Sequence, residues 1–148
     1  MAFLKSFSQN EISKDSVITN QLTLQQKDSI AKNLTPIQGK AIVYIIRSTL
    51  LGAVIKMNIE SDSIHIGSTK AEKYIYTILE PRTHTFLAKS ENKSSFELTV
   101  EAGKIYFIKQ QVKMGFLFAQ TGLKLITDEE GRKLLSKCKL SSDNLLTN

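Results

Sequence analysis

The sequence has little of what most enzymes and metal proteins need. Its 148 residues include one cysteine, Cys138, and two histidines, His65 and His84. A single cysteine excludes an intramolecular disulfide and leaves too few thiols for a cysteine-built zinc site. No nucleophile elbow, Walker loop or glycine-rich dinucleotide turn is present. We therefore predict that the protein is not an enzyme and has no catalytic residues, metal site or cofactor.

Long hydrophobic runs and a targeting segment are also missing from the printed sequence. No apolar run reaches the roughly 18 residues that a membrane-spanning helix needs. The first ten residues are interrupted by Lys5 and by serines, unlike the apolar centre of a secretory signal. We expect no membrane span and a cytoplasmic protein as the sequence stands, or an envelope-associated protein if a leader has been removed.

Positive charge exceeds negative charge, but the excess is spread out. The net charge is +6, from 20 Lys and Arg against 14 Asp and Glu. Lysines alternate with strand residues and are interrupted by acidic residues, which is typical of solvated strand surfaces. A nucleic-acid interface would need a concentrated basic patch. We therefore expect no nucleic-acid partner, although the excess would weakly favour an anionic surface.

From Gly39 onward the sequence is organised as short β-branched or alternating segments separated by turn residues. This spacing is typical of a sandwich or barrel. We predict a mainly β fold, an antiparallel β-sandwich of about eight strands within residues 37–140. The expected strands cover residues 40–47, 53–60, 64–66, 73–79, 83–90, 95–100, 104–112, 116–119 and 123–126.

Two capping boxes predict a helix on either side of the strands. In the segments TLQQ and TDEE, a threonine is followed three residues later by Gln or Glu, so that both can satisfy free backbone N–H groups. We expect the N-terminal arm to dock on the domain or on another subunit. The predicted parts are a polar arm over residues 1–36 with a short helix over 24–33, a C-terminal helix over 128–139, and a flexible tail over 141–148.

Six short motifs follow one another in an order that is similar to a known family. They are Gly39–Arg47 (GKAIVYIIR), Leu51–Ala53 (LGA), Pro81–His84 (PRTH), Ala102–Phe107 (AGKIYF), Val112–Gly115 (VKMG) and Glu129–Lys133 (EEGRK). This ordered set resembles the bacterial family known as domain of unknown function 2846, over about residues 36–140. The resemblance implies a small β-sandwich related to PEGA-type surface domains, often on lipid-anchored envelope proteins, with no assigned catalytic residues. The chain departs from the family at Arg82, where a glycine is expected, and in having no lipobox cysteine.

Two polar residues on inward-facing strand positions are candidates for a site, Arg47 and His84. A pocket that held both would bind a small molecule or a carbohydrate, or, less readily, would catalyse a reaction. We favour structural roles instead. His84 would then be hydrogen-bonded to a neighbouring strand or turn, and Arg47 would form an ion pair with Glu80 or Glu101.

Two pairs of aromatic residues are further candidates for binding. Alternation places Tyr74 and Tyr76 on one face of a strand, where they would form a platform for sugars or pair within the core, and we favour the core. Phe116 and Phe118 would form an exposed hydrophobic edge. We therefore predict a non-catalytic binding or assembly module that acts through strand edges or surface patches, with a protein partner or self-association as a homo-oligomer.

Overall fold

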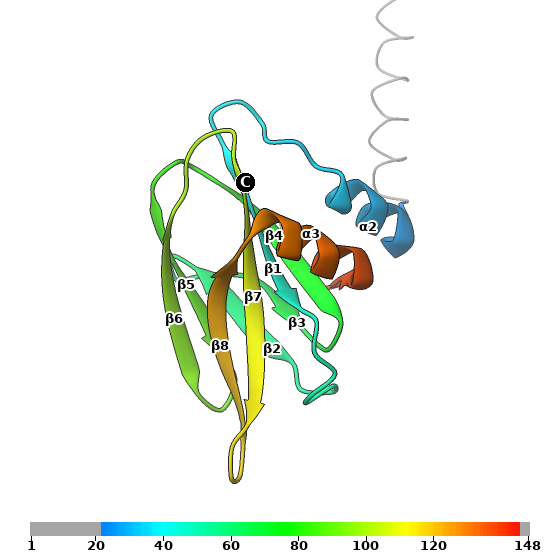
Figure 1. The fold of residues 1–148 in the computed structure, drawn as a ribbon, viewed down its shortest axis with the longest axis vertical. Helices are drawn as coiled ribbons and strands as arrows, with labels where there is room; N and C mark the ends of the chain where they lie inside the picture. Colours follow the sequence, from blue (N-terminus) through cyan, green and yellow to red (C-terminus); the bar gives the residue numbers. More distant parts are fainter. Residues whose placement is uncertain (1–21, 146–148) are drawn as a thin grey trace, which may run out of the picture.

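The protein is a β-sandwich with two helices packed on one side, in a computed structural model that describes residues 22–145 (Figure 1). The predicted fold is confirmed. The rest of the predicted N-terminal arm, residues 1–21, lies outside the described residues. The helices are α2 (Leu24–Lys32) and α3 (Asp128–Lys137), and the strands are β1 (Ala41–Arg47), β2 (Met57–Ser61), β3 (Ile64–Thr69), β4 (Lys73–Leu79), β5 (Thr83–Lys89), β6 (Lys93–Thr99), β7 (Ile105–Met114), β8 (Ala119–Ile126) and β9 (Lys139–Leu140).

The strands form a five-stranded sheet in the order β8-β7-β1-β4-β9 and a four-stranded sheet in the order β3-β2-β5-β6. Most neighbours are antiparallel, as predicted, but β1 pairs with β7, and β4 with β9, in parallel. Because β1 and β7 run in the same direction, their C-terminal ends point to the same end of the sandwich. The loop between β1 and β2 and the turn between β7 and β8 therefore start at the same end of the molecule.

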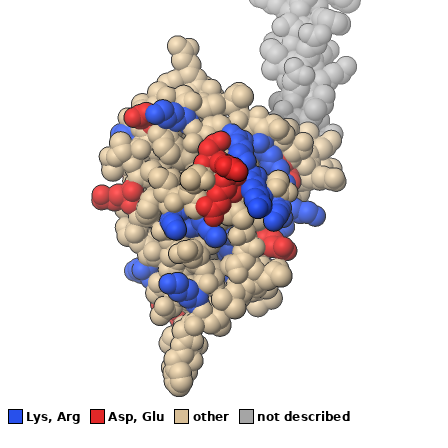
Figure 2. Space-filling view, in the orientation of Figure 1, with Lys and Arg blue, Asp and Glu red and all other residues tan. Residues whose placement is uncertain are grey.

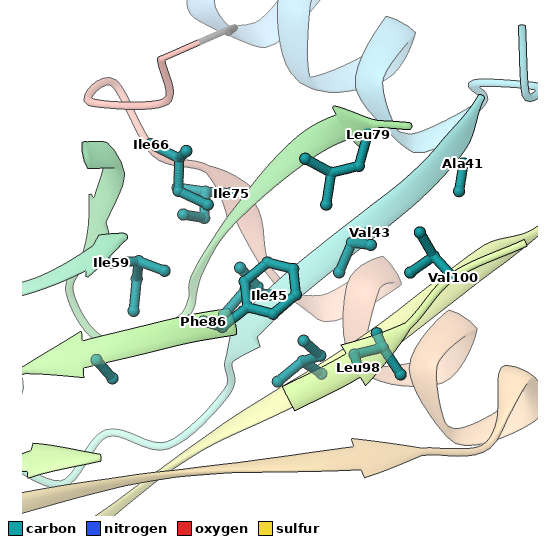
Figure 3. Packing of buried hydrophobic residues seen from close by; sticks show 12 residues of the cluster. Ala41, Val43, Ile45, Ile59, Ile66, Ile75, Leu79, Phe86, Leu98 and Val100 are labelled. Atoms are coloured by element: carbon teal, nitrogen blue, oxygen red, sulfur yellow. The ribbon is translucent and has the colours of Figure 1, made fainter. Parts of the chain in front are cut away.

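Strand β1 is buried on both faces, which explains its continuous apolar sequence AIVYIIR. Its alternate residues Ala41, Val43 and Ile45 face the four-stranded sheet and pack with Phe86 and Leu98, among others (Figure 3). These side chains form the core between the two sheets. Burial of this many branched residues is the main source of stability that the structure shows.

The opposite face of β1 carries Ile42, Tyr44 and Ile46, which pack under the helices with Ala31 and Leu135. The molecule therefore has three layers: the four-stranded sheet, the five-stranded sheet and the helix pair. Cys138 lies in the same cluster and is buried.

Helix α2 is fastened to the sheet by Asp28. One carboxylate oxygen accepts hydrogen bonds from the Tyr74 hydroxyl at 2.7 Å and the Leu140 N–H at 2.8 Å, and the other pairs with Lys32 at 2.9 Å. Burial opposes ionisation, but these donors outweigh it and hold the pKa of Asp28 below its ordinary value. The part of the predicted arm that is described therefore docks on its own domain.

Three local predictions are wrong. Residues 116–119 were expected to be a strand, but 116–118 form the tip of the β7–β8 hairpin, and one strand covers 119–126. Residues 53–56 are loop, since β2 begins at Met57. A loose tail was expected from Ser141, yet residues 141–145 run along the sheets, where the N–H groups of Ser141 and Leu145 bond the carbonyls of Tyr74 and Ile66 at 2.9 and 2.8 Å.

Candidate functional site

One end of the sandwich is held by a polar network around His84. The buried ring places Nδ1 2.5 Å from Asp62 Oδ2 and Nε2 2.7 Å from the Glu80 carbonyl oxygen. Asp62 also accepts from the Thr85 N–H at 3.0 Å and pairs with Arg82 at 3.2 Å. Both ring nitrogens face oxygen acceptors, so neither is available to a ligand. We call these residues, Asp62, Glu80, Arg82, His84 and Thr85, the closed pole.

Ionised Asp62 is the centre of the closed pole. Its partial burial would raise its pKa, but the hydrogen bonds from Thr85 and His84 and the charge of Arg82 outweigh this effect and lower the pKa below the ordinary value. The family resemblance led us to expect glycine at position 82, and Arg82 instead supplies a charge partner that glycine could not.

The buried Arg47 side chain lies at the other end of β1 and fixes the loop between β1 and β2. Its guanidinium donates to the carbonyl oxygens of Ile55 and Gly52, both at 2.6 Å, and of Thr69 at 3.0 Å. The predicted ion pair with Glu80 or Glu101 is wrong, because the two terminal nitrogens of the guanidinium bond backbone carbonyls instead. Burial lowers the pKa of Arg47 from its ordinary value, and the carbonyl dipoles offset part of that cost.

The proposed pocket that would contain both Arg47 and His84 is contradicted by this geometry. Arg47 lies opposite Lys73, at the start of β4, whereas His84 bonds Glu80, just beyond the end of β4. A seven-residue strand separates them, which is about 20 Å at the usual rise. The two residues therefore belong to opposite ends of the sandwich.

Tyr74 and Tyr76 lie on the same face of β4, as predicted, but that face is covered by α2. Tyr74 is completely buried and its hydroxyl is held by Asp28, so it offers no platform for a sugar. Tyr76 is nearly buried and forms part of one wall of a hollow of about 520 Å³, together with Leu24, Ile30 and Leu140.

Phe116 and Phe118 lie at the tip of the β7–β8 hairpin, which projects from the sandwich (Figure 1). Phe116 is 100% exposed, Leu117 73% and Phe118 54%. The Gly115 N–H donates to the Phe118 carbonyl at 2.8 Å and closes the turn. Turns usually carry polar residues, Gly or Pro, so three large apolar side chains at this turn are unusual.

More exposed apolar residues lie at the same end of the molecule. The loop between β1 and β2 starts there because β1 and β7 are parallel, and it carries exposed Leu50, Leu51 and Val54. We call the combined set the apolar pole; its members are Leu50, Leu51, Val54, Met114, Phe116, Leu117 and Phe118. Sequence reasoning found the two phenylalanines but missed Leu117, Met114 and the loop. The signal was available in the unbroken apolar run FLF after Gly115.

Free strand edges offer less for binding than we expected. At the edge strand β8, the Asn92 side chain accepts from the Thr121 N–H at 2.8 Å and donates to the Thr121 carbonyl at 3.1 Å. At β3, the Leu145 N–H bonds the Ile66 carbonyl. These contacts occupy edge groups that would otherwise pair with another strand.

Charged side chains are interspersed over the face that carries α3, with red and blue groups side by side in Figure 2. Helix α3 itself begins with Asp128, Glu129 and Glu130 and has Lys137 in its last turn. Within residues 22–145, no group of three or more His, Cys, Asp and Glu side chains could hold a metal ion. None of the helices in this part of the chain is long and apolar enough to cross a membrane.

These features define a small β-sandwich with a helix layer and an apolar pole. The chain matches the family described as "Protein of unknown function (DUF2846)" over residues 37–122 and belongs to that family, which confirms the resemblance. It is 26% identical over 120 residues to an uncharacterized protein of Haemophilus influenzae, covering 80% of this chain and 71% of the relative. No solved structure matches the chain.

Proposed function

We propose that the protein is a non-catalytic binding module that contacts its partner through the apolar pole. The observation that supports this proposal is the complete exposure of Phe116 at the apex of a paired hairpin. An apolar side chain in water costs free energy that burial against a partner would recover. Contiguous exposed apolar patches are uncommon on monomeric soluble proteins and often mark interaction sites.

The buried side chains that could take part in catalysis have structural roles or are unreactive. His84 is bonded on both nitrogens, and Arg47 holds four carbonyl groups, those of Leu51, Gly52, Ile55 and Thr69. Burial raises the pKa of the Cys138 thiol to about 11, so the reactive thiolate is scarce at neutral pH. These assignments support a binding role over a catalytic one.

Site-specific photo-crosslinking in cells tests the proposal. A photoreactive side chain would replace Phe116 in one strain and Ile64 in another. Ile64 is a matched control, because it is 57% exposed but follows the turn at Asp62, in the closed pole. We expect adducts with protein, lipid or a second copy from position 116 and few from position 64. Equal labelling from both positions, or none from 116, would contradict the proposal.

A further inference from the structure

We propose that the tip of the β7–β8 hairpin inserts into the surface of an anionic lipid bilayer. This inference rests on the proposed function, since it names the partner of the apolar pole. The tip residues Phe116, Leu117 and Phe118 would enter the boundary between headgroups and acyl chains, and Lys113 behind them would lie at the level of the phosphates.

The hairpin is built to present its tip rigidly. Eight residue pairs join β7 to β8, from Phe107 with Ile126 to Met114 with Ala119. As far as Lys109, strand β7 also pairs with β1, in the middle of the five-stranded sheet, and beyond Lys109 the pairing with β8 continues to Met114. The tip therefore does not have to become ordered when it binds, which lowers the entropic cost of insertion.

The shape and composition of the tip favour a fluid apolar layer over a groove on another protein. Figure 2 shows the tip as an uncharged projection at the lower end of the molecule. Phe116, Leu117 and Phe118 are consecutive residues at the bend of the hairpin, and all three are more than half exposed. A groove would have to enclose the projection to cover all three, whereas acyl chains surround it without a shaped site.

Lys113 lies at a distance from the apex that would place its ammonium group among lipid headgroups. Lys113, opposite Gln120, lies three residue steps behind the apex, which is about 10 Å at the rise of a strand. Apolar segments that lie in the interface penetrate roughly 5–10 Å. When the tip is inserted, Lys113 would reach the headgroups, where an anionic lipid attracts a cation.

Other charged groups near the tip are of both signs and balance one another. Beneath Met114 and Phe118 a recess is lined by Lys56 and Lys89 and by one acid, Glu91. Lys56 pairs with Asp143 at 2.9 Å, and Lys89 pairs with Glu60 at 2.5 Å. Lys113 has no such carboxylate partner among residues 22–145. The electrostatic contribution to binding should therefore come mainly from Lys113 and from the net charge of +6.

The exposed loop between β1 and β2 would form a second, shallower contact. Its packing against the hairpin is close, because a Cβ at Gly52 would lie 3.6 Å from Val112. β7 continues beyond the last residue pair that it forms with β1, Ile46 with Lys109, by five residues. Leu50 and Val54 would then reach the headgroups only when the tip is already inserted.

Vesicle flotation of the full chain tests the inference. Wild type is mixed with vesicles of phosphatidylcholine alone or with equimolar phosphatidylcholine and phosphatidylglycerol. We expect wild type to float with the mixed vesicles and less with the neutral ones. The double substitution Phe116→Ser and Phe118→Ser should weaken partitioning at least about 30-fold, because two large apolar side chains are lost. Ile64→Ser should stay within about twofold of wild type.

A substitution of Lys113 tests the electrostatic contribution separately from the apolar contribution of the tip. Lys113→Glu should weaken binding to the mixed vesicles by about tenfold at low salt and leave binding to neutral vesicles unchanged. The inference is overturned if wild type floats with neither vesicle, or if the double serine variant floats as wild type does. Protein or self adducts at position 116 without flotation would reject the lipid partner and leave the proposed binding module standing.

Discussion

The two ends of this sandwich differ in which side chains they bury and which they expose. At the closed pole, polar groups that could bind a ligand are bonded to one another, and the single buried histidine has no free nitrogen. At the apolar pole, side chains that could be buried are left in water, and Phe116 touches nothing that shields it. Residue type alone is therefore a poor guide to a binding site in this protein. The buried histidine has a structural role, whereas the phenylalanine at the tip is exposed to solvent.

The largest effect on stability should come from Arg47, which holds the loop between β1 and β2. Arg47→Ala would leave the carbonyls of Gly52, Ile55 and Thr69 without their donor. We expect a loss of about 3 kcal/mol in the free energy of unfolding and a melting temperature lower by about 10 °C. Thermal and denaturant unfolding measure this. A melting temperature within about a degree of wild type would show that the guanidinium does not hold the loop.

The next largest effect on stability should come from a position in the helix layer, away from both poles. Gly131 on α3 packs so closely that a Cβ there would lie 2.1 Å from Cγ of Phe107. Alanine is the better helix former, yet we expect Gly131→Ala to destabilise the protein by about 1–2 kcal/mol through overpacking. Chemical denaturation measures it, with exposed Ser136→Ala on the same helix as the control. Stabilisation by Gly131→Ala would contradict the packing.

Acid should weaken the closed pole through Asp62. Its folded pKa lies below the ordinary value of 3.8, so its contribution is complete above about pH 5 and is lost as pH falls through the folded pKa. Asp62→Asn keeps the shape and tolerates the left-handed backbone at φ 50°. We expect the variant to lose about 1–2 kcal/mol at pH 7. It should lose less stability than wild type between pH 5 and pH 2, and parallel curves would contradict the network.

The smallest effect on stability should come from the tip itself. Phe116 is fully exposed and Phe118 is about half exposed, so we expect the double substitution Phe116→Ser and Phe118→Ser to change the free energy of unfolding by no more than about 1 kcal/mol. Denaturant titration measures this for the same protein that is used in flotation. A large loss would mean that the tip is needed for folding, and the contrast between the poles would fail.

Much of the fold could be predicted because its signals are local. The β-branched run KAIVYIIR predicted a strand over residues 40–47, and the threonine capping boxes at Thr23 and Thr127 predicted both helix starts. The parallel pairing of β1 with β7 could not be predicted, because 57 residues lie between Arg47 and Ile105 and no local pattern records which strands become neighbours.

The candidate sites were harder to predict for the same reason. Alternation showed that His84 faces inward, but its partners Asp62 and Glu80 come from other elements. Arg47 was paired with a carboxylate because composition does not reveal which carbonyls a loop will present. The sequence indicates that Phe116 is exposed but predicts a strand there, because the apolar sequence of this turn is typical of a strand.

Insertion of the hairpin tip into a bilayer can be followed with a tryptophan at position 117. The chain contains no tryptophan, so Leu117→Trp would place a single fluorescent reporter at the tip. With equimolar phosphatidylcholine and phosphatidylglycerol vesicles, we expect a blue shift of its emission and quenching by lipids brominated on their acyl chains. Ile64→Trp, beside the closed pole, should show neither change. Emission at position 117 that stays that of a water-exposed indole when vesicles are added would contradict insertion.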